Sequence, residues 1–443
     1  MPATRAAGSL VICCLFLIGV ATWLPTARAA GTAVDVAPTA GVAERVRTYS
    51  LDAMDSDTQA SLGAISPAPR GQPWARPPDD ALVVRHDPQA YPLVPLPQLF
   101  VSNGSTMSQP FSSWSSSDRH DCAWGDYDRD GYLDLFCAVG LDDSSTNELW
   151  HNSGNGTFVE TSASQGFGNA ATTHGRYRTA SFVDANGDGW PDIYVTRFNA
   201  AEAGLFPSPA DTYPNELWIN RGSGLGFYLD TSLGLTSQAS AQKDNDGCNQ
   251  AFDYDDNGSQ DVIMCGSAGF RLYKKSVGGS YSNVSKGAGV GGFWADGEWG
   301  DFNADGLADL VQVKGTIARI MEQTATHTFR SVWSSSLTGG LNLATGDVDG
   351  DGVLDIYVVA TCTGKPASDR PDYIYYGSAA NAGASVGAPL SFAVQQVPGL
   401  GSSSNGCGNT VEAIDYDRDA RADFFVLNGH KTTPGPNQLW TVP

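Results

Sequence analysis

The chain has 443 residues, a net charge of −22, a charged fraction of only 17%, 51 glycines and an aromatic fraction of 10%. This composition favours an all-β protein with many turns over a helical one. Only eight of the 48 acidic residues are Glu and 40 are Asp, a residue that is frequent in turns and in cation sites. No basic patch is visible in the sequence, which argues against nucleic acid as a partner.

The N-terminus predicts a secretory signal peptide over residues 1–29. Arg5 supplies a positive start, residues 10–20 are apolar, and Ala27-Arg28-Ala29 matches the small-x-small pattern of a cleavage site. The apolar stretch is too short to span a membrane comfortably, and no later segment looks transmembrane. We therefore expect a protein that is secreted, periplasmic or displayed at the cell surface.

Residues 30–94 differ in composition from the rest of the chain. They are rich in Ala, Pro and Asp, and residues 67–97 hold nine of the 24 prolines. Such a segment is typical of a linker or of an arm that lies on a folded domain. We therefore predict three parts: a signal peptide at 1–29, a linker or arm at 30–94 and a folded domain at 95–443.

The folded domain contains an Asp-rich repeat. The nine-residue pattern D-x-[DN]-x-[DN]-G-x-x-D occurs six times, with 46 to 69 residues between the first Asp of successive copies. A period of this size predicts an array of similar units, such as the blades of a β-propeller. Positions 1, 3, 5 and 9 are the candidate metal ligands, and in the six copies they are Asp126, Asp128, Asp130 and Asp134; Asp184, Asn186, Asp188 and Asp192; Asp253, Asp255, Asn257 and Asp261; Asp301, Asn303, Asp305 and Asp309; Asp347, Asp349, Asp351 and Asp355; and Asp415, Asp417, Asp419 and Asp423.

Short runs of β-branched and aromatic residues follow most copies and predict strands. The second strand begins at position 9, as in Asp192-Ile193-Tyr194-Val195, and the third resembles Asn147-Glu148-Leu149-Trp150. With one strand before the loop and a fourth after the third, each unit has the four strands of a propeller blade. We predict six blades, the last completed by Gln98-Leu99-Phe100-Val101. A seventh blade built from residues 31–120 is the alternative.

Export would leave six cysteines, and two pairs of them share one register around the loops. Relative to the first Asp of their loops, Cys122 and Cys137 lie at −4 and +11, and Cys248 and Cys265 lie at −5 and +12. Both pairs sum to +7, as residues directly opposite in one antiparallel hairpin register do. We predict disulfides Cys122–Cys137 and Cys248–Cys265, which leaves Cys362 and Cys407 as a third pair.

The chemistry of the repeated loop indicates calcium. Ca²⁺ takes six to eight oxygen ligands, and positions 1, 3 and 5 place short carboxylate or amide arms on one side of the loop. Position 6 is Gly in every copy except the sixth, which has Ala420. The carbonyl of position 7 and the Asp at position 9 would complete the shell. We predict up to six bound Ca²⁺ ions.

Two other interpretations of the loop exist. An EF-hand shares positions 1, 3, 5 and 6, but it needs a Glu at position 12 and a following helix. No copy has that Glu, and strands are predicted to follow. A metal-free Asx-turn, in which Asp side chains bond the backbone, stays open, above all for the third copy with Asn257 and the sixth with Ala420.

The repeat resembles a known family. Residues 346–356 look like the FG-GAP (VCBS-type) repeat that builds the propeller head of integrin α chains and many secreted bacterial proteins. Residues 147–158 resemble the bacterial repeat proteins and the cartilage acidic protein group. The resemblance covers residues 95–443 and implies a Ca²⁺-bearing propeller with calcium loops on one face and ligand contacts on the other. The family is functionally broad, so the fold alone does not fix an activity.

We expect an extracellular binding or adhesion module for glycan or protein. Its candidate ligand residues, opposite the calcium loops, are His120, His174, Arg176, Asp246 and Trp294. Two alternatives stay open. A carbohydrate-active enzyme of the lyase or dehydratase type would use His120, His174 and Arg176 as its acid and base groups, although we assign no catalytic residue. The other alternative is a purely structural scaffold at the cell surface.

Overall fold

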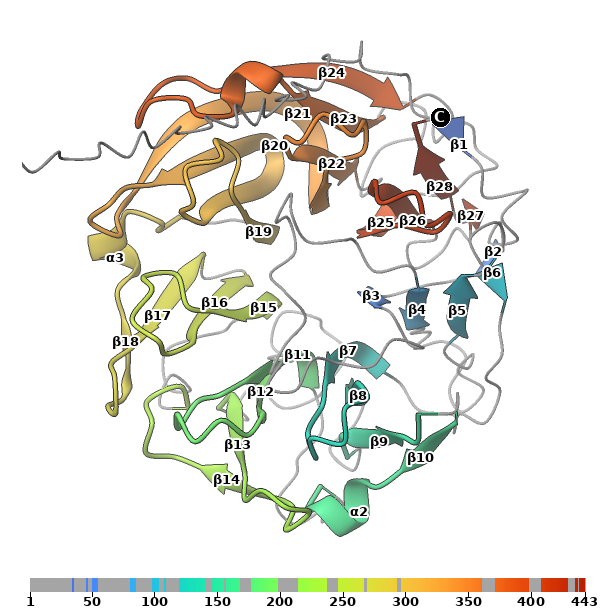
Figure 1. The fold of residues 1–443 in the computed structure, drawn as a ribbon, viewed down its shortest axis with the longest axis vertical. Coiled ribbons are helices and arrows are strands. Elements are labelled where there is room, and N and C mark those ends of the chain that lie inside the picture. The colour runs from blue at the N-terminus through green and yellow to red at the C-terminus, as the bar shows by residue number, and fades with distance from the viewer. Residues whose placement is uncertain are drawn as a thin grey trace, which may run out of the picture.

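The protein is a ring of antiparallel β-sheets (Figure 1), which confirms the predicted β-propeller class. Within the described part of the chain, no helix has the length and apolar character needed to cross a membrane. The predicted signal peptide at 1–29 lies outside the described residues. The computed structural model describes residues 34–35, 45–46, 50–54, 80–84, 98–102, 107–108, 119–139, 146–154, 157–167, 177–197, 214–236, 246–266, 269–292, 296–360, 371–397, 408–428, 435–436 and 438–442.

Five of the described sheets have four strands each. Their strands are β3 (Ser50–Met54), β4 (Asp80–Val84), β5 (Gln98–Ser102) and β6 (Met107–Ser108); β7 (Arg119–Gly125), β8 (Asp134–Val139), β9 (Glu148–Asn152) and β10 (Phe158–Glu160); β11 (Tyr177–Val183), β12 (Asp192–Arg197), β13 (Glu216–Asn220) and β14 (Phe227–Asp230); β15 (Asp246–Phe252), β16 (Asp261–Gly266), β17 (Arg271–Lys275) and β18 (Tyr281–Asn283); and β25 (Gly408–Ile414), β26 (Asp423–Asn428), β28 (Gln438–Thr441) and β1 (Val34–Asp35).

A sixth large sheet has six strands, and a small one pairs β2 (Arg45–Val46) with β27 (Gly435–Pro436). Short helical turns α2 (Ser162–Gln165), α3 (Ser285–Ala288) and η4 (Ala379–Asn381) lie between strands. The strands of the large sheet are β19 (Asp296–Gly300), β20 (Asp309–Gln323), β21 (Phe329–Gly346), β22 (Asp355–Ala360), β23 (Asp372–Gly377) and β24 (Phe392–Val397).

The prediction of six four-stranded blades, with seven as the alternative, is wrong in its count. The structure has five separate four-stranded sheets among the described residues, and two copies of the Asp loop share the six-stranded sheet. The physical reason lies in β21, which runs on from the fourth unit into the fifth, and in β20, whose two halves form one continuous strand. β20 passes through a register shift between Gly315 and Ile317 without a turn, so no loop separates its two halves.

The strand that closes the ring also differs from the prediction. We expected Gln98-Leu99-Phe100-Val101 to complete the last sheet, but these residues belong to β5, which pairs with β4 and β6. The two-residue β1 takes that place, with Val34 opposite Thr441 and Asp35 opposite Trp440. Residues 34–35, 50–54 and 80–84, which we placed in a linker or arm, are therefore strands of the ring.

The predicted hairpin around each Asp loop is confirmed. In all six copies the residue before the first Asp lies opposite the Asp at position 9, as Gly125 does with Asp134. Cys122 and Cys137 lie opposite each other and form the predicted disulfide. Cys265 is also disulfide-bonded and lies opposite Cys248, whose side chain is outside the described residues. Cys362 and Cys407 lie outside the described residues altogether.

The Asn-Glu-Leu-Trp motif of the third strand has a structural role. Leu149 is fully buried, and Glu148 accepts hydrogen bonds from the Trp150 indole (3.0 Å) and from the Arg119 side chain of β7. The Asn147 amide oxygen accepts the N–H of Val139, the last residue of β8 (3.1 Å). The motif therefore ties the first three strands of its sheet together, because each of its polar groups reaches a different strand.

Polar side chains on the innermost strands link neighbouring sheets. β3, β7, β11, β15, β19 and β25 lie nearest the axis of the ring (Figure 1). The Asp121 carboxylate of β7 accepts the N–H of Ala180 on β11 (3.1 Å), and the Asn342 amide oxygen of β21 accepts the N–H of Val411 on β25 (2.8 Å). β11 and β25 are edge strands, so these outward N–H groups find their acceptors in the next sheet.

Replacing Asn342 with Ala should destabilise the ring. Its Nδ2 group donates to Asp296 (2.7 Å), and its Oδ1 atom accepts from the Thr410 hydroxyl (3.0 Å) as well as from Val411. We expect the free energy of unfolding to fall by about 1–3 kcal/mol, because buried polar groups lose their partners. Urea denaturation with calcium present measures this. Thr338→Ala, at an exposed position of the same strand, is the control; equal stability of the two variants would contradict the prediction.

Candidate metal centres

All six Asp loops share one backbone conformation. Position 4 has a positive φ in each copy, and so does position 6. These angles place two residues of every loop in the left-handed region, which turns the chain sharply enough for positions 1, 3 and 5 to face one another. The residues concerned are Arg129 and Gly131, Gly187 and Gly189, Asp256 and Gly258, Ala304 and Gly306, Gly350 and Gly352, and Arg418 and Ala420, with φ from 53° to 95°.

The carboxylate at position 1 closes the loop on itself. In the first copy, Asp126 accepts the N–H groups of Asp130 and Gly131, both at 3.0 Å. The same two bonds, from positions 5 and 6, recur in the other five copies. These bonds are compatible with both the Asx-turn and the calcium interpretation, because a carboxylate oxygen that accepts one N–H group has a second lone pair with which it can bind a cation.

The carboxylate at position 9 joins the loop to the third strand. Asp134 accepts the N–H of Tyr127 at position 2 (3.1 Å) and the N–H of Asn152 on β9 (2.8 Å). Equivalent pairs of bonds form at Asp192, Asp261, Asp309 and Asp355. Every position-9 Asp is at most 1% exposed.

Burial raises the pKa of these position-9 carboxyl groups. It raises the pKa of Asp134 to about 9, of Asp192 and Asp309 to about 8 and of Asp261 to about 7, despite the opposing effect of the backbone N–H donors. The pKa of Asp355 also lies well above its usual range for the same reason. Such groups are stable as anions only when a positive charge is nearby, so a bound cation would compensate for the missing solvent.

Carboxylate oxygens converge in four of the loops. One oxygen from each of Asp126, Asp128 and Asp134 lies within 4.8 Å of the others, and the third, fifth and sixth loops contain similar triplets. In the second and fourth loops position 3 is Asn, and its Nδ2 atom donates to the Asp at position 5 (2.8 Å from Asn186, 3.1 Å from Asn303).

The donor set fits a hard divalent cation. In the sixth loop the Oδ1 atom of Asp417 is buried and, among the residues that the structure describes, has no hydrogen-bond partner. Asp417 lies in the triplet with Asp415 and Asp423, so this oxygen is a candidate ligand for a bound cation. All-oxygen donors are what Ca²⁺ and Mg²⁺ prefer.

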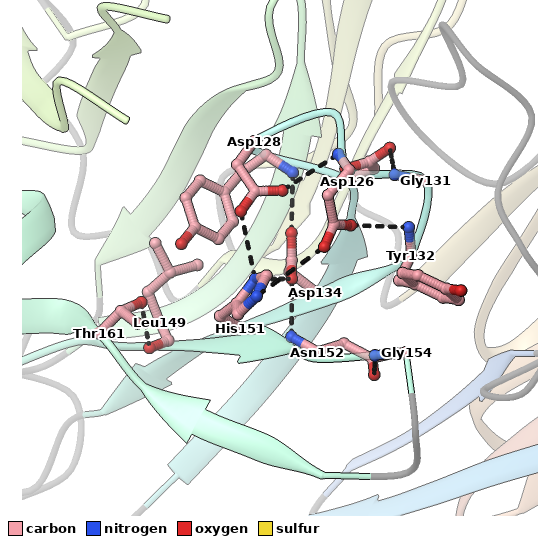
Figure 2. A network of polar contacts seen from close by, with 12 residues as sticks. Asp126, Asp128, Gly131, Tyr132, Asp134, Leu149, His151, Asn152, Gly154 and Thr161 are labelled. Atoms are coloured by element: carbon pink, nitrogen blue, oxygen red, sulfur yellow. Dashed lines mark hydrogen bonds and ion pairs between the residues drawn. The ribbon is translucent and has the colours of Figure 1, made fainter. Parts of the chain in front are cut away.

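The first loop has a neighbour that sequence reasoning missed. His151 of β9 points into the loop (Figure 2), with its Nδ1 atom 3.2 Å from Asp128 and 3.2 Å from Asp134. His151 comes directly before Asn152, whose N–H bonds the position-9 Asp. We call this third-strand position the gate position. In the six copies it is occupied by His151, Ile219, Lys274, Glu322, Tyr376 and Thr441.

The predicted ligand-face residues are not brought together by described contacts. His120 and Asp246 lie on β7 and β15, two of the innermost strands, but their side chains are outside the described residues. His174, Arg176 and Trp294 also fall outside the described part of the chain. The predicted ligand face therefore stays a prediction.

Comparisons with known proteins support the repeat. Residues 126–195 match the family model of the FG-GAP-like repeat. This match, which contains the first two Asp loops, and the propeller fold together fit an FG-GAP repeat propeller. No curated protein matches the chain.

Among solved structures, several are similar to this chain at low sequence identity. A lectin of Agrocybe aegerita that recognises terminal N-acetylglucosamine is 16% identical, with 75% of this chain and 85% of that chain covered and a TM-score of 0.44. The Cps50 (Swd1) propeller of Myceliophteria thermophila is 11% identical, with 90% and 99% covered and a TM-score of 0.47. A Lactobacillus plantarum protein is 10% identical, with 82% and 96% covered and a TM-score of 0.46.

The sixth Asp loop should gain stability from Ala420→Gly. Ala420 has a φ of 68°, where a Cβ atom is unfavourable, and the other five copies have Gly there. We expect the free energy of unfolding to rise by about 1 kcal/mol. Thermal unfolding measures the change, and Ala185→Gly, at a buried position outside the left-handed region, is expected to destabilise instead. A less stable Ala420→Gly variant would contradict the strain that we infer.

The raised pKa values predict how stability depends on pH once metal is removed. The folded-state pKa values of about 7 to 9 at Asp261, Asp192 and Asp134 exceed the unfolded value of 3.8, so the folded state binds more protons. In EDTA we therefore expect the melting temperature to fall as pH rises from 5 to 9. Calcium replaces those protons and should reduce this fall. Calorimetry at several pH values tests this, and an EDTA-treated protein that becomes more stable towards pH 9 would contradict it.

Proposed function

We propose that this chain is an exported calcium-binding β-propeller that serves as an extracellular binding module for a glycan or protein partner. The observation that carries the proposal is the set of six matching loops, in four of which carboxylate oxygens converge, with one ligand oxygen of Asp417 left without a protein donor among the described residues. The Cys122–Cys137 disulfide supports export, because such bonds persist in oxidising compartments.

Calcium would be held by positions 1, 3, 5 and 9 of every loop that binds it. The ion supplies positive charge to carboxylates that the fold has taken out of water, and it offsets their mutual repulsion. The position-9 Asp bonds both the loop and the third strand, so an ion on that Asp also fixes three strands of one sheet. The protein's own contribution is to hold the acceptor oxygens in place before the ion arrives.

A binding role follows from where the loops lie. Each loop connects the innermost strand of its unit to the next strand, so metal binding steadies the strands that surround the axis of the ring (Figure 1). His120 and Asp246, on two of these innermost strands, belong to the ligand face in this proposal. A ring fixed in this way presents its surface residues with little loss of conformational entropy on binding.

Partner binding should require calcium. We expect the purified chain to retain a glycan or a protein from an extracellular set when Ca²⁺ is present and to lose it in EDTA, measured on glycan and protein arrays. Asp355→Asn removes one buried ligand and should weaken binding about tenfold or more. Asp256→Asn, at the exposed position 4 of the third loop, should not change it.

The outcomes separate this proposal from its alternatives. Partner binding that is the same in EDTA would contradict the role of calcium. Release of a cleaved polysaccharide from the array would show an enzyme rather than a binding module, and failure to bind any glycan or protein would contradict both.

A further inference from the structure

The third loop differs from the others at its gate position. We propose that the ammonium group of Lys274 serves as the built-in cation of the third loop, so that this loop stays free of metal while other loops take calcium. The inference rests on the proposed function, because it concerns which of the calcium loops are filled. In this inference one residue of the third strand determines whether the loop binds a metal ion.

The ion pair of Lys274 engages the ligand at position 3. The Nζ atom of Lys274, on β17, contacts the Oδ2 atom of Asp255. The Asp255 side chain is only 3% exposed, whereas that of Lys274 is 37% exposed, so the lysine reaches inward from the surface. The other oxygen of Asp255 accepts the Nδ2 group of Asn257 (2.5 Å). Both oxygens of this carboxylate are therefore occupied by protein donors.

Position 5 of the same loop also turns a donor towards the site. The Nδ2 atom of Asn257 donates to Asp255 and to the carbonyl oxygen of Lys275 (3.1 Å), while its Oδ1 atom accepts the N–H of Ser259 (2.9 Å). In this arrangement the Asn257 amide turns its donor end towards Asp255, and its Oδ1 atom already accepts one hydrogen bond. The sixth loop differs, because its position-3 residue, Asp417, keeps an oxygen without a protein donor among the described residues.

The gate position explains why the third loop is the exception. It brings His151 to Asp128 in the first loop and Glu322 to Asn303 in the fourth (3.1 Å), so its side chain reaches position 3 repeatedly. In the third loop alone the gate residue is a lysine. Lys carries a compact positive charge on a flexible stem, so it can place that charge where a bound ion would contact Asp255.

The charge of the loop agrees with this assignment. At its ligand positions the third loop has carboxylates at Asp253, Asp255 and Asp261, because position 5 is Asn257, whereas the first, fifth and sixth loops have four there. Lys274 cancels one of the three charges. A calcium ion would therefore meet two uncompensated carboxylates and a nearby ammonium group that repels it. Calcium would be expected to fill the four-carboxylate loops first; in the sixth of them Arg421 contacts Asp419 at position 5 and leaves Asp417 at position 3 with an oxygen that has no protein donor among the described residues.

Counting bound calcium ions in variants tests the inference. We will compare the full chain with its Lys274→Met variant by native mass spectrometry after dialysis against calcium, and expect the variant to bind one more Ca²⁺ ion. Methionine keeps the length of the stem but removes the charge. Lys286→Met, which removes an exposed lysine on α3, is the matched control and should bind the same number of ions as the unmodified chain.

Substitutions of the position-3 carboxylate give a second test. Asp255→Asn should leave the number of bound ions unchanged, whereas Asp349→Asn, at the same position of the fifth loop, should lower it by one. Amide hydrogen exchange gives an independent readout: in EDTA, residues 253–261 should stay as protected as in calcium, while residues 347–355 should lose protection.

The results distinguish this inference from the proposed function. An unchanged ion count in Lys274→Met, or one ion fewer in Asp255→Asn, would overturn the assignment of Lys274 even if the other loops bind calcium. If the unmodified chain binds no calcium, the proposed function fails. In that case one ion in Lys274→Met would still support the inference, and none would overturn it as well.

Discussion

The buried carboxylate at position 9 is the constraint on which the propeller depends. It lies at the start of the second strand, accepts an N–H group from the loop and accepts another from the third strand, as Asp355 does with Val348 and Gly377. Each of its two oxygens accepts one N–H group, which the amide of Asn could not do because it has a single oxygen, yet burial disfavours the anion. The acid is therefore best explained by a positive charge that the loop receives from outside, or, in the third loop, from Lys274.

The loops also contact one another around the ring. The Nδ2 group of Asn220 donates to the carbonyl oxygen of Tyr127 in the preceding loop (2.8 Å), and the guanidinium of Arg129 lies over the ring of Trp190 in the following loop (4.4 Å). The backbone N–H of Asp184 donates to the Gln260 side chain of the third loop (2.7 Å). Because the first three loops touch in this way, an ion that orders one of them also restrains its neighbours.

Much of this structure could be predicted from local sequence. The loop spacing and the register of Cys122 opposite Cys137 predicted the hairpins correctly, because pairing across a short turn depends only on nearby residues. The closing strand β1 could not be predicted, since two residues carry no periodic signal and their partner lies about 400 residues away. The contact of His151 with Asp128 was missed for a related reason: it depends on the register between two strands, which the motif alone does not display.

The closure of the ring has a mechanical consequence. β1 joins β28 through only two residue pairs, Val34 with Thr441 and Asp35 with Trp440, whereas the hairpins around the Asp loops are longer, and that of β7 and β8 is cross-linked by a disulfide. Tension applied between the segments before β1 and after β28 would load this seam first. The ring of sheets would open between β1 and β28, and each Asp loop would stay intact within its own hairpin.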